Sequence, residues 1–147
     1  MGRDCRLRVV VTSVSSDSHT WNLVYLQLLL EEMGHHVTNL GPCVPDLELL
    51  GRCREIAPDL IVVSSVNGHG CRDGMRAIGV LRGCPEFVTT PIVIGGKLDV
   101  SGGAESNRER LLAAGFDAVF PRDADVDAFR AYVATLPART DQPAGAR

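Results

Sequence analysis

The chain has 147 residues, close to the usual size of one domain, and 45% of them are hydrophobic, which is enough for a two-sided core. Its net charge of -3 and the lack of any Lys/Arg run give no reason to expect nucleic acid or an anionic membrane surface as a partner. The apolar runs are short and interrupted by charge, so no transmembrane helix is predicted.

The cysteines and the start of the chain bear on the compartment. There are five cysteines, an odd number, and no Cys-x-x-Cys pair, so neither a disulfide framework nor a zinc ribbon is predicted. The first residues lead directly into a strand pattern and lack signal-peptide organisation. We therefore expect reduced thiols and a cytoplasmic protein.

Strand and helix patterns alternate along the whole chain. In chain order, we predict a strand at 7–12, a helix from 20 or 21 to 33, a strand at 36–40, a helix at 46–56, a strand at 60–64, a helix at 72–82, a strand at 91–94, a helix at 105–114, a strand at 118–120 and a helix at 126–135. Gly95-Gly96 is expected to end the fourth strand. The apolar positions of the second helix, Leu47, Leu50 and Ile56, fit a helical period only loosely.

Five βα units in succession predict an α/β fold with one doubly wound, five-stranded parallel sheet. A flavodoxin-like (Rossmann-like) strand order of 2-1-3-4-5 is expected. The run at 60–64 is continuously apolar, which is typical of a central strand buried on both faces. Residues 1–136 form the predicted domain, and residues 137–147, rich in Pro, Ala, Gly and charge, form a predicted disordered tail.

Polar and glycine-rich segments follow the first, third and fourth strands. They contain Asp17-x-His19, the stretch from Ser64 to Gly70, and Gly95-Gly96-Lys97. In open α/β sheets, ligands bind at the carboxyl ends of the strands, where these three segments should meet. An Asp two residues before a His can hold one imidazole nitrogen and leave the other free to bind a metal or move a proton.

The three segments together resemble the cobalamin-binding signature Asp-x-His-x-x-Gly … Ser-x-Leu … Gly-Gly. The matching stretches are Asp17-Ser18-His19-Thr20-Trp21-Asn22, Ser64-Ser65-Val66 and Gly95-Gly96. The local context is similar to the small subunit of glutamate mutase (methylaspartate mutase), with further likeness at Ser16, Gly68, Gly70, Phe120 and Pro121. The resemblance covers about residues 7–136.

The resemblance implies that this chain binds adenosylcobalamin. His19 would be the lower axial ligand of cobalt, and Asp17 would hold its other nitrogen. The displaced nucleotide tail would enter the domain, where Ser64 would bond the base or ribose and Gly95 and Gly96 would leave room. Lys97, directly after the glycine pair, is an unusual neighbour that could contact a phosphate. The implied cofactor-binding residues are Ser16, Asp17, Ser18, His19, Thr20, Trp21, Asn22, Ser64, Ser65, Val66, Gly68, Gly70, Gly95, Gly96, Lys97, Phe120 and Pro121.

The resemblance also implies a hetero-oligomer. A separate large barrel subunit would bind substrate and carry the radical chemistry, the rearrangement of L-glutamate and threo-3-methylaspartate. This chain, inactive alone, would supply binding and orientation. Two positions depart from the signature, since Asn22 stands in place of the glycine and Val66 in place of the leucine.

Simpler interpretations stay open for single residues. Asp17 is also a good helix N-cap type, His19 could be a solvated loop histidine, and Gly95-Gly96 could be an ordinary turn. Trp21 could pack in the core or in a subunit interface.

Two other functions of a flavodoxin-like fold are disfavoured by the sequence. A flavodoxin-like carrier is disfavoured because the first loop lacks the expected glycine and aromatic residues are only 5%. A receiver module is disfavoured because Ser64-Ser65 replaces the phosphoacceptor Asp. A cobalamin-fold domain without cofactor, acting as a partner-binding module, and a carrier for another mutase or methyltransferase are the remaining alternatives.

Overall fold

The computed structural model describes residues 6–66, 70–96, 104–121 and 125–137. Residues 138–147 of the predicted tail, Gly68 and Lys97 lie outside the described residues. The elements are β1 (Arg8–Ser13), α1 (Trp21–Glu32), β2 (His36–Asn39), α2 (Asp46–Ile56), β3 (Leu60–Ser65), α3 (Gly70–Arg82), the short 3-10 helix η1 (Pro85–Phe87), β4 (Ile92–Gly96), α4 (Ala104–Ala114), β5 (Ala118–Pro121) and α5 (Val126–Ala134). None of the described helices is long and apolar enough to cross a membrane.

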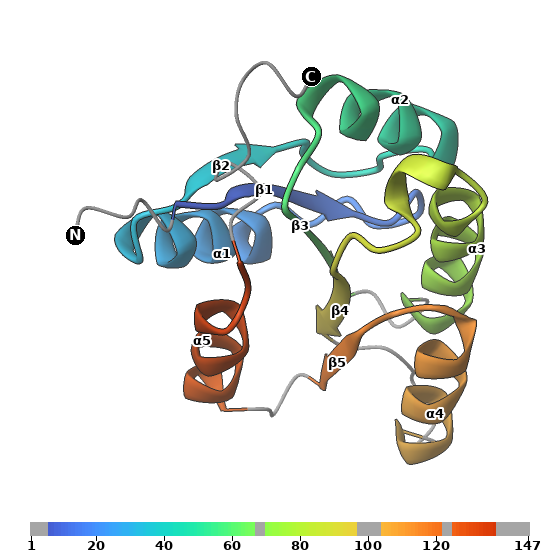
Figure 1. Ribbon diagram of the computed structural model, residues 1–147. Helices are drawn as coiled ribbons and strands as arrows, with labels where there is room; N and C mark the ends of the chain where they lie inside the picture. The colour runs from blue at the N-terminus through green and yellow to red at the C-terminus, as the bar shows by residue number, and fades with distance from the viewer. Residues whose placement is uncertain (1–5, 67–69, 97–103, 122–124, 138–147) are drawn as a thin grey trace.

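The strands form one parallel sheet in the order β2-β1-β3-β4-β5, which confirms the predicted architecture. Helices α1 and α5 cover one face of the sheet, and α2, α3 and α4 cover the other (Figure 1). One row of register partners crosses the carboxyl edge from Ser13 to Ser64, Gly95 and Phe120. The carboxyl ends of β1, β3, β4 and β5 therefore lie next to one another at this edge.

The central strand β3 is buried along its whole length. Its side chains alternate between two separate cores, because successive residues of a strand point to opposite faces. Ile61 and Val63 join the core under α2, α3 and α4, whereas Leu60 and Val62 join the core under α1 and α5. This explains why the sequence of β3 is continuously apolar.

Two local predictions were wrong. The fourth strand does not stop before the glycine pair but continues through it, with Gly95 and Gly96 as its last two residues. The helix α3 begins at Gly70 instead of residue 72. In α2 the buried side chains are Leu49 and Cys53, four residues apart on one face, whereas Leu47 is 75% exposed.

Close strand packing requires the glycines in β4. A Cβ on Gly95 would lie 2.8 Å from the carbonyl oxygen of Phe120, and a Cβ on Gly96 would lie 2.0 Å from that of Ser65. Gly96 also has a φ of +107°, in the region that side chains rarely adopt. The pair therefore brings bare backbone to the carboxyl edge, between the ends of β3 and β5.

Candidate functional site

The loop between β1 and α1 folds back on itself before the helix starts. The N–H of Asp17 donates to the carbonyl oxygen of Val14 (3.1 Å), and the N–H of Cys43 donates to the carbonyl oxygen of Asp17 (2.8 Å). The N-cap of α1 is Thr20, whose side chain makes no capping hydrogen bond. Asp17 is therefore not the helix cap, and its carboxylate is used elsewhere.

The carboxylate of Asp17 is fully buried and joins two loops. Its Oδ1 accepts hydrogen bonds from the main-chain N–H of His19 (3.0 Å) and from His19 Nδ1 (2.6 Å). Its Oδ2 accepts from the main-chain N–H of Val66 (2.7 Å), directly after β3. Burial alone would raise the pKa of Asp17, but these hydrogen bonds and one with the Ser65 side chain outweigh it, so the pKa is lowered.

The imidazole of His19 is oriented by this contact. Because an ionised carboxylate only accepts, Nδ1 must carry the hydrogen, which leaves the lone pair on Nε2. The side chain is 57% exposed although its partner has no exposure at all. The site thus offers a fixed, accessible nitrogen base at the carboxyl edge of the sheet.

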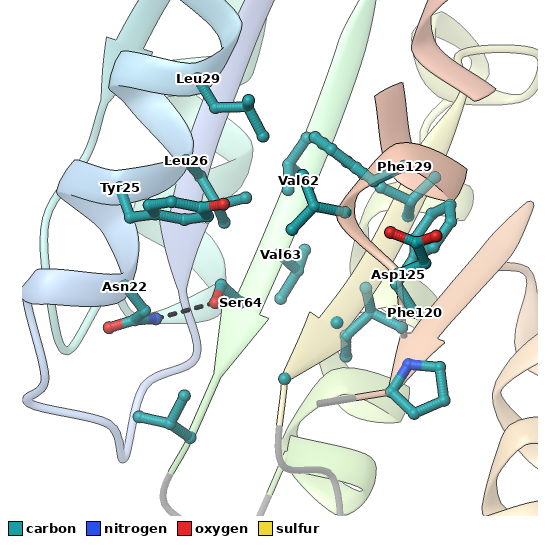
Figure 2. Close-up of a pocket in the computed structure, with 17 residues that line it drawn as sticks. Asn22, Tyr25, Leu26, Leu29, Val62, Val63, Ser64, Phe120, Asp125 and Phe129 are labelled. Atoms are coloured by element: carbon teal, nitrogen blue, oxygen red, sulfur yellow. Dashed lines mark hydrogen bonds between the residues drawn. The ribbon is translucent and has the colours of Figure 1, made fainter. Parts of the chain in front are cut away.

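A cavity of about 230 Å³ opens at the same carboxyl edge of the sheet, between α1, the sheet and α5 (Figure 2). Its lining is mostly apolar. Phe129 of α5 packs edge-on against Phe120 of β5, with the ring centroids 5.4 Å apart. The lining residues are Asn22, Tyr25, Leu26, Leu29, Val62, Val63, Ser64, Val66, Val93, Ile94, Gly95, Gly96, Phe120, Pro121, Asp125, Val126 and Phe129.

One polar pair lies at the floor of the cavity. Asn22 on α1 and Ser64 on β3 point toward one another (Figure 2), and Asn22 Nδ2 donates to Ser64 Oγ (2.8 Å). Ser64 is only 4% exposed. Its register partner on β4 is Gly95, which has no side chain to fill the space next to the Ser64 hydroxyl.

The predicted site residues fall into two groups. The structure brings seven of them together around the cavity: Asn22, Ser64, Val66, Gly95, Gly96, Phe120 and Pro121. Asp17 contacts this group through the N–H of Val66, and His19 is not among the residues that line the cavity. Outside the lining, Ser18 and Thr20 are exposed, Trp21 is 82% exposed, Ser65 is buried against Asp17, and Gly70 is buried at the start of α3. Trp21 therefore does not pack in the core.

Ser16 has a structural partner. Its hydroxyl donates to the carboxylate of Asp73, a buried residue of α3. Arg76, one turn later, donates to Asp73 (3.2 Å), to Asp46 of α2 (2.6 Å) and to the Ser15 hydroxyl (2.8 Å). This network ties the loop that carries His19 to two helices on the opposite face of the sheet.

Sequence reasoning missed this network and the helical walls of the cavity. Leu26 and Leu29 read as ordinary core positions, and Phe129 belongs to no motif. The apolar period of α1 does identify these leucines, but only the packing of α1 opposite α5 shows that they border a cavity.

The chain is a doubly wound α/β domain with a carboxylate-held imidazole and an apolar cavity at the carboxyl edge of its sheet. Residues 7–130 match the B12 binding domain, and the chain belongs to this family. The resemblance to glutamate mutase small subunits is confirmed by curated relatives. The chain is 31% identical over 116 residues to the glutamate mutase sigma subunit of Fusobacterium nucleatum, covering 77% of this chain and 83% of that protein.

A second relative and two solved structures extend the comparison. Glutamate mutase sigma subunit 2 of Haloarcula marismortui is 32% identical over 138 residues, 92% of each chain. A cobalamin-binding protein from Desulfitobacterium hafniense superposes with a TM-score of 0.70 at 22% identity, over 87% of this chain and 59% of that one. A receiver domain from Pseudomonas aeruginosa gives 0.64 at 15% identity, over 87% and 94%. These two structures show a shared fold.

Proposed function

We propose that this chain is the cobalamin-binding small subunit of an adenosylcobalamin-dependent carbon-skeleton mutase of the glutamate mutase type. It would act with a separate large barrel subunit in the interconversion of L-glutamate and threo-3-methylaspartate. The observation that carries the proposal is the buried Asp17 carboxylate holding the exposed imidazole of His19, at the same carboxyl edge of the sheet as an apolar cavity. The relatives named glutamate mutase sigma subunit support the choice of enzyme.

The residues present fit a corrin with a displaced tail. A single imidazole suits a metal that brings its other ligands with it, as cobalt in a corrin does. The cavity, about 230 Å³ and mostly apolar, suits a flat base and its ribose better than the whole macrocycle. Bare backbone at Gly95 and Gly96 leaves the edge between β3 and β5 open to a long ligand.

Each group of this chain then has a defined task. His19 Nε2 donates its lone pair to the metal, and Asp17 fixes the tautomer and the ring orientation. Ser64 bonds the base or ribose at the cavity floor, and Leu26, Leu29 and Phe129 exclude water around it. Bound adenosylcobalamin would supply the radical chemistry, whereas this chain binds and orients.

The surface next to the cavity supports a partner subunit. Trp21, Tyr25 and Leu28 are 82%, 53% and 60% exposed, and they follow a helical spacing along α1. Tyr25 also lines the cavity. An exposed apolar stripe continuous with the ligand site is typical of a surface that another protein covers, so we propose a hetero-oligomer.

Spectroscopy of the cobalt(II) form tests the axial ligand. The chain is labelled with nitrogen-15 histidine, loaded with cob(II)alamin and measured by electron paramagnetic resonance, alone and with a glutamate mutase large subunit. We expect the nitrogen splitting of cobalt to change with the label, because the ligand comes from the protein. His19→Ala should abolish this change, and His36→Ala, which removes an exposed histidine of β2, should not.

Reconstitution tests the substrate. With a large subunit and adenosylcobalamin, methylaspartate formed from glutamate is measured as mesaconate through methylaspartate ammonia-lyase. Cobalamin binding without turnover would point to another mutase or a methyltransferase. The absence of cobalamin binding both alone and with the large subunit would leave a cofactor-free interaction module.

A further inference from the structure

Asn22 occupies the position where the family signature has glycine, and its amide enters the cavity lining. Asn22 Nδ2 donates to Ser64 Oγ (2.8 Å), and this bond uses a lone pair of the hydroxyl. A serine hydroxyl has one hydrogen to donate and two lone pairs to accept with. With a donor already fixed on one side, the Ser64 hydrogen must point elsewhere.

The surroundings of Ser64 indicate that this hydrogen points into the cavity. The residue is 4% exposed, and its hydroxyl has no acceptor among the described residues. Asn22 Oδ1, at the other end of the amide, is also buried without a hydrogen-bond partner in this part of the chain. Gly95 lies beside it without a side chain, and the nearby lining at Val62, Val66 and Phe120 is apolar. The hydroxyl therefore presents a hydrogen-bond donor in a mostly apolar space, where an unmatched polar group is costly.

We propose that Asn22 is a specificity-determining residue that fixes Ser64 as a donor and so selects a cobamide whose tail base carries a free ring nitrogen. This inference rests on the proposed function. Benzimidazole and purine tails have such a nitrogen once the tail has left cobalt, and its lone pair can accept from Ser64. A phenolic tail is linked through oxygen and has no ring nitrogen, so it leaves the donor unmatched.

An isosteric substitution reverses the polarity of the pair. In Asn22→Asp the new carboxylate can only accept, so the Ser64 hydroxyl turns toward it and presents lone pairs to the cavity. The preference for a nitrogen-bearing base should then be lost. Asn39→Asp is the matched control, because Asn39 at the end of β2 also donates to a side chain, Gln27 Oε1 (3.2 Å), but lies outside the cavity lining.

The measurement is the dissociation constant of three corrinoids. They are a cobamide with a benzimidazole tail, a cobamide with a phenolic tail, and cobinamide, which has no tail. Equilibrium dialysis followed by corrin absorbance gives each value, for the full chain together with its large subunit. The quantity compared is the ratio between the benzimidazole and phenolic compounds, so that any general effect of the new charge cancels. We expect Asn22→Asp to shift this ratio about tenfold against benzimidazole, and Asn39→Asp to leave it unchanged.

A Ser64→Ala background shows whether Asn22 acts through Ser64. There, Asn22→Asp should change the ratio by less than about twofold, since the group that it orients is gone. An equal loss for both tails, or an unchanged shift in the Ser64→Ala background, would overturn the inference and leave the proposed function standing. If the unaltered assembly retains none of the three compounds, both the inference and the proposed function are wrong.

Discussion

The replacement of Asp17 by Asn tests the centre of the site, because this buried carboxylate both stabilises the fold and orients His19. An asparagine keeps one acceptor oxygen and replaces the other with an NH₂ donor. In one orientation the NH₂ faces the N–H of Val66, and in the other it faces the N–H and Nδ1 of His19. Either orientation sets a donor against a donor in a fully buried position.

The magnitude follows from the number of bonds affected. A hydrogen bond to a charged group contributes about 1.5–3 kcal/mol, and a buried donor without a partner costs about 1–3 kcal/mol. Since one side of the carboxylate keeps an acceptor, we expect the free energy of unfolding to fall by about 2–4 kcal/mol. If His19 binds cobalt as proposed, loss of the group that orients it should also weaken cobalamin binding about 10- to 100-fold.

Urea unfolding and cobalamin titration separate the two effects, with Asp59→Asn as the matched control. Asp59 is equally buried, and its Oδ2 accepts from the N–H of Arg8 (2.8 Å) at the opposite, amino edge of the sheet. We expect the control to lose stability and keep its cobalamin affinity. If Asp17→Asn unfolds at the same urea concentration as the unaltered chain, or if both variants lose affinity equally, the role assigned to Asp17 is refuted.

Three further predictions concern the rest of the fold. Burial lowers the pKa of His35, whose Nδ1 accepts a hydrogen bond from the N–H of Leu7 (3.0 Å). The unfolded chain therefore binds the proton more readily than the folded chain, and the free energy of unfolding should fall as the pH drops below the ordinary value of 6.5. Urea unfolding of the unaltered chain and of His35→Gln across this pH range isolates the effect. Gly96→Ala should cost about 4 kcal/mol or more in unfolding free energy, whereas Gly51→Ala, with no atom within 4 Å of the new Cβ, should be neutral or stabilising; thermal melts compare the two. Asp73→Asn should speed hydrogen exchange in residues 14–20 without changing that of β2, since it weakens the anchor of this loop.

The sequence predicts the sheet well because the patterns that identify its strands lie within short segments of the chain. The apolar run of β3 and the alternation of strands and helices determine a parallel sheet, and handedness rules restrict its order. The extent of β4 was harder to predict, since glycines usually weaken strands and here serve close backbone packing. The apolar positions named for α2 from the sequence do not include Leu49 and Cys53, which are the two that the structure buries.

The site was less predictable because its parts are far apart in sequence. The Asp17 and His19 pair is a local motif, but its contact with Val66 spans 49 residues. The anchor of Ser16 on Asp73 spans 57 residues and has no sequence pattern. The cavity depends on how α1 packs opposite α5, which residue spacing within either helix does not determine.

The residues at the carboxyl edge differ in how strongly they argue for a ligand. Gly95 and Gly96 are required by the approach of β3, β4 and β5, so the fold accounts for them without any cofactor. Asp17 is likewise explained in part by the loops that it joins. His19 is different, because its ring is 57% exposed and yet held in one tautomer by a buried carboxylate. Stability does not require an exposed imidazole to be oriented, whereas a metal ligand must be, so His19 is the residue that argues most directly for the proposed cobalamin site.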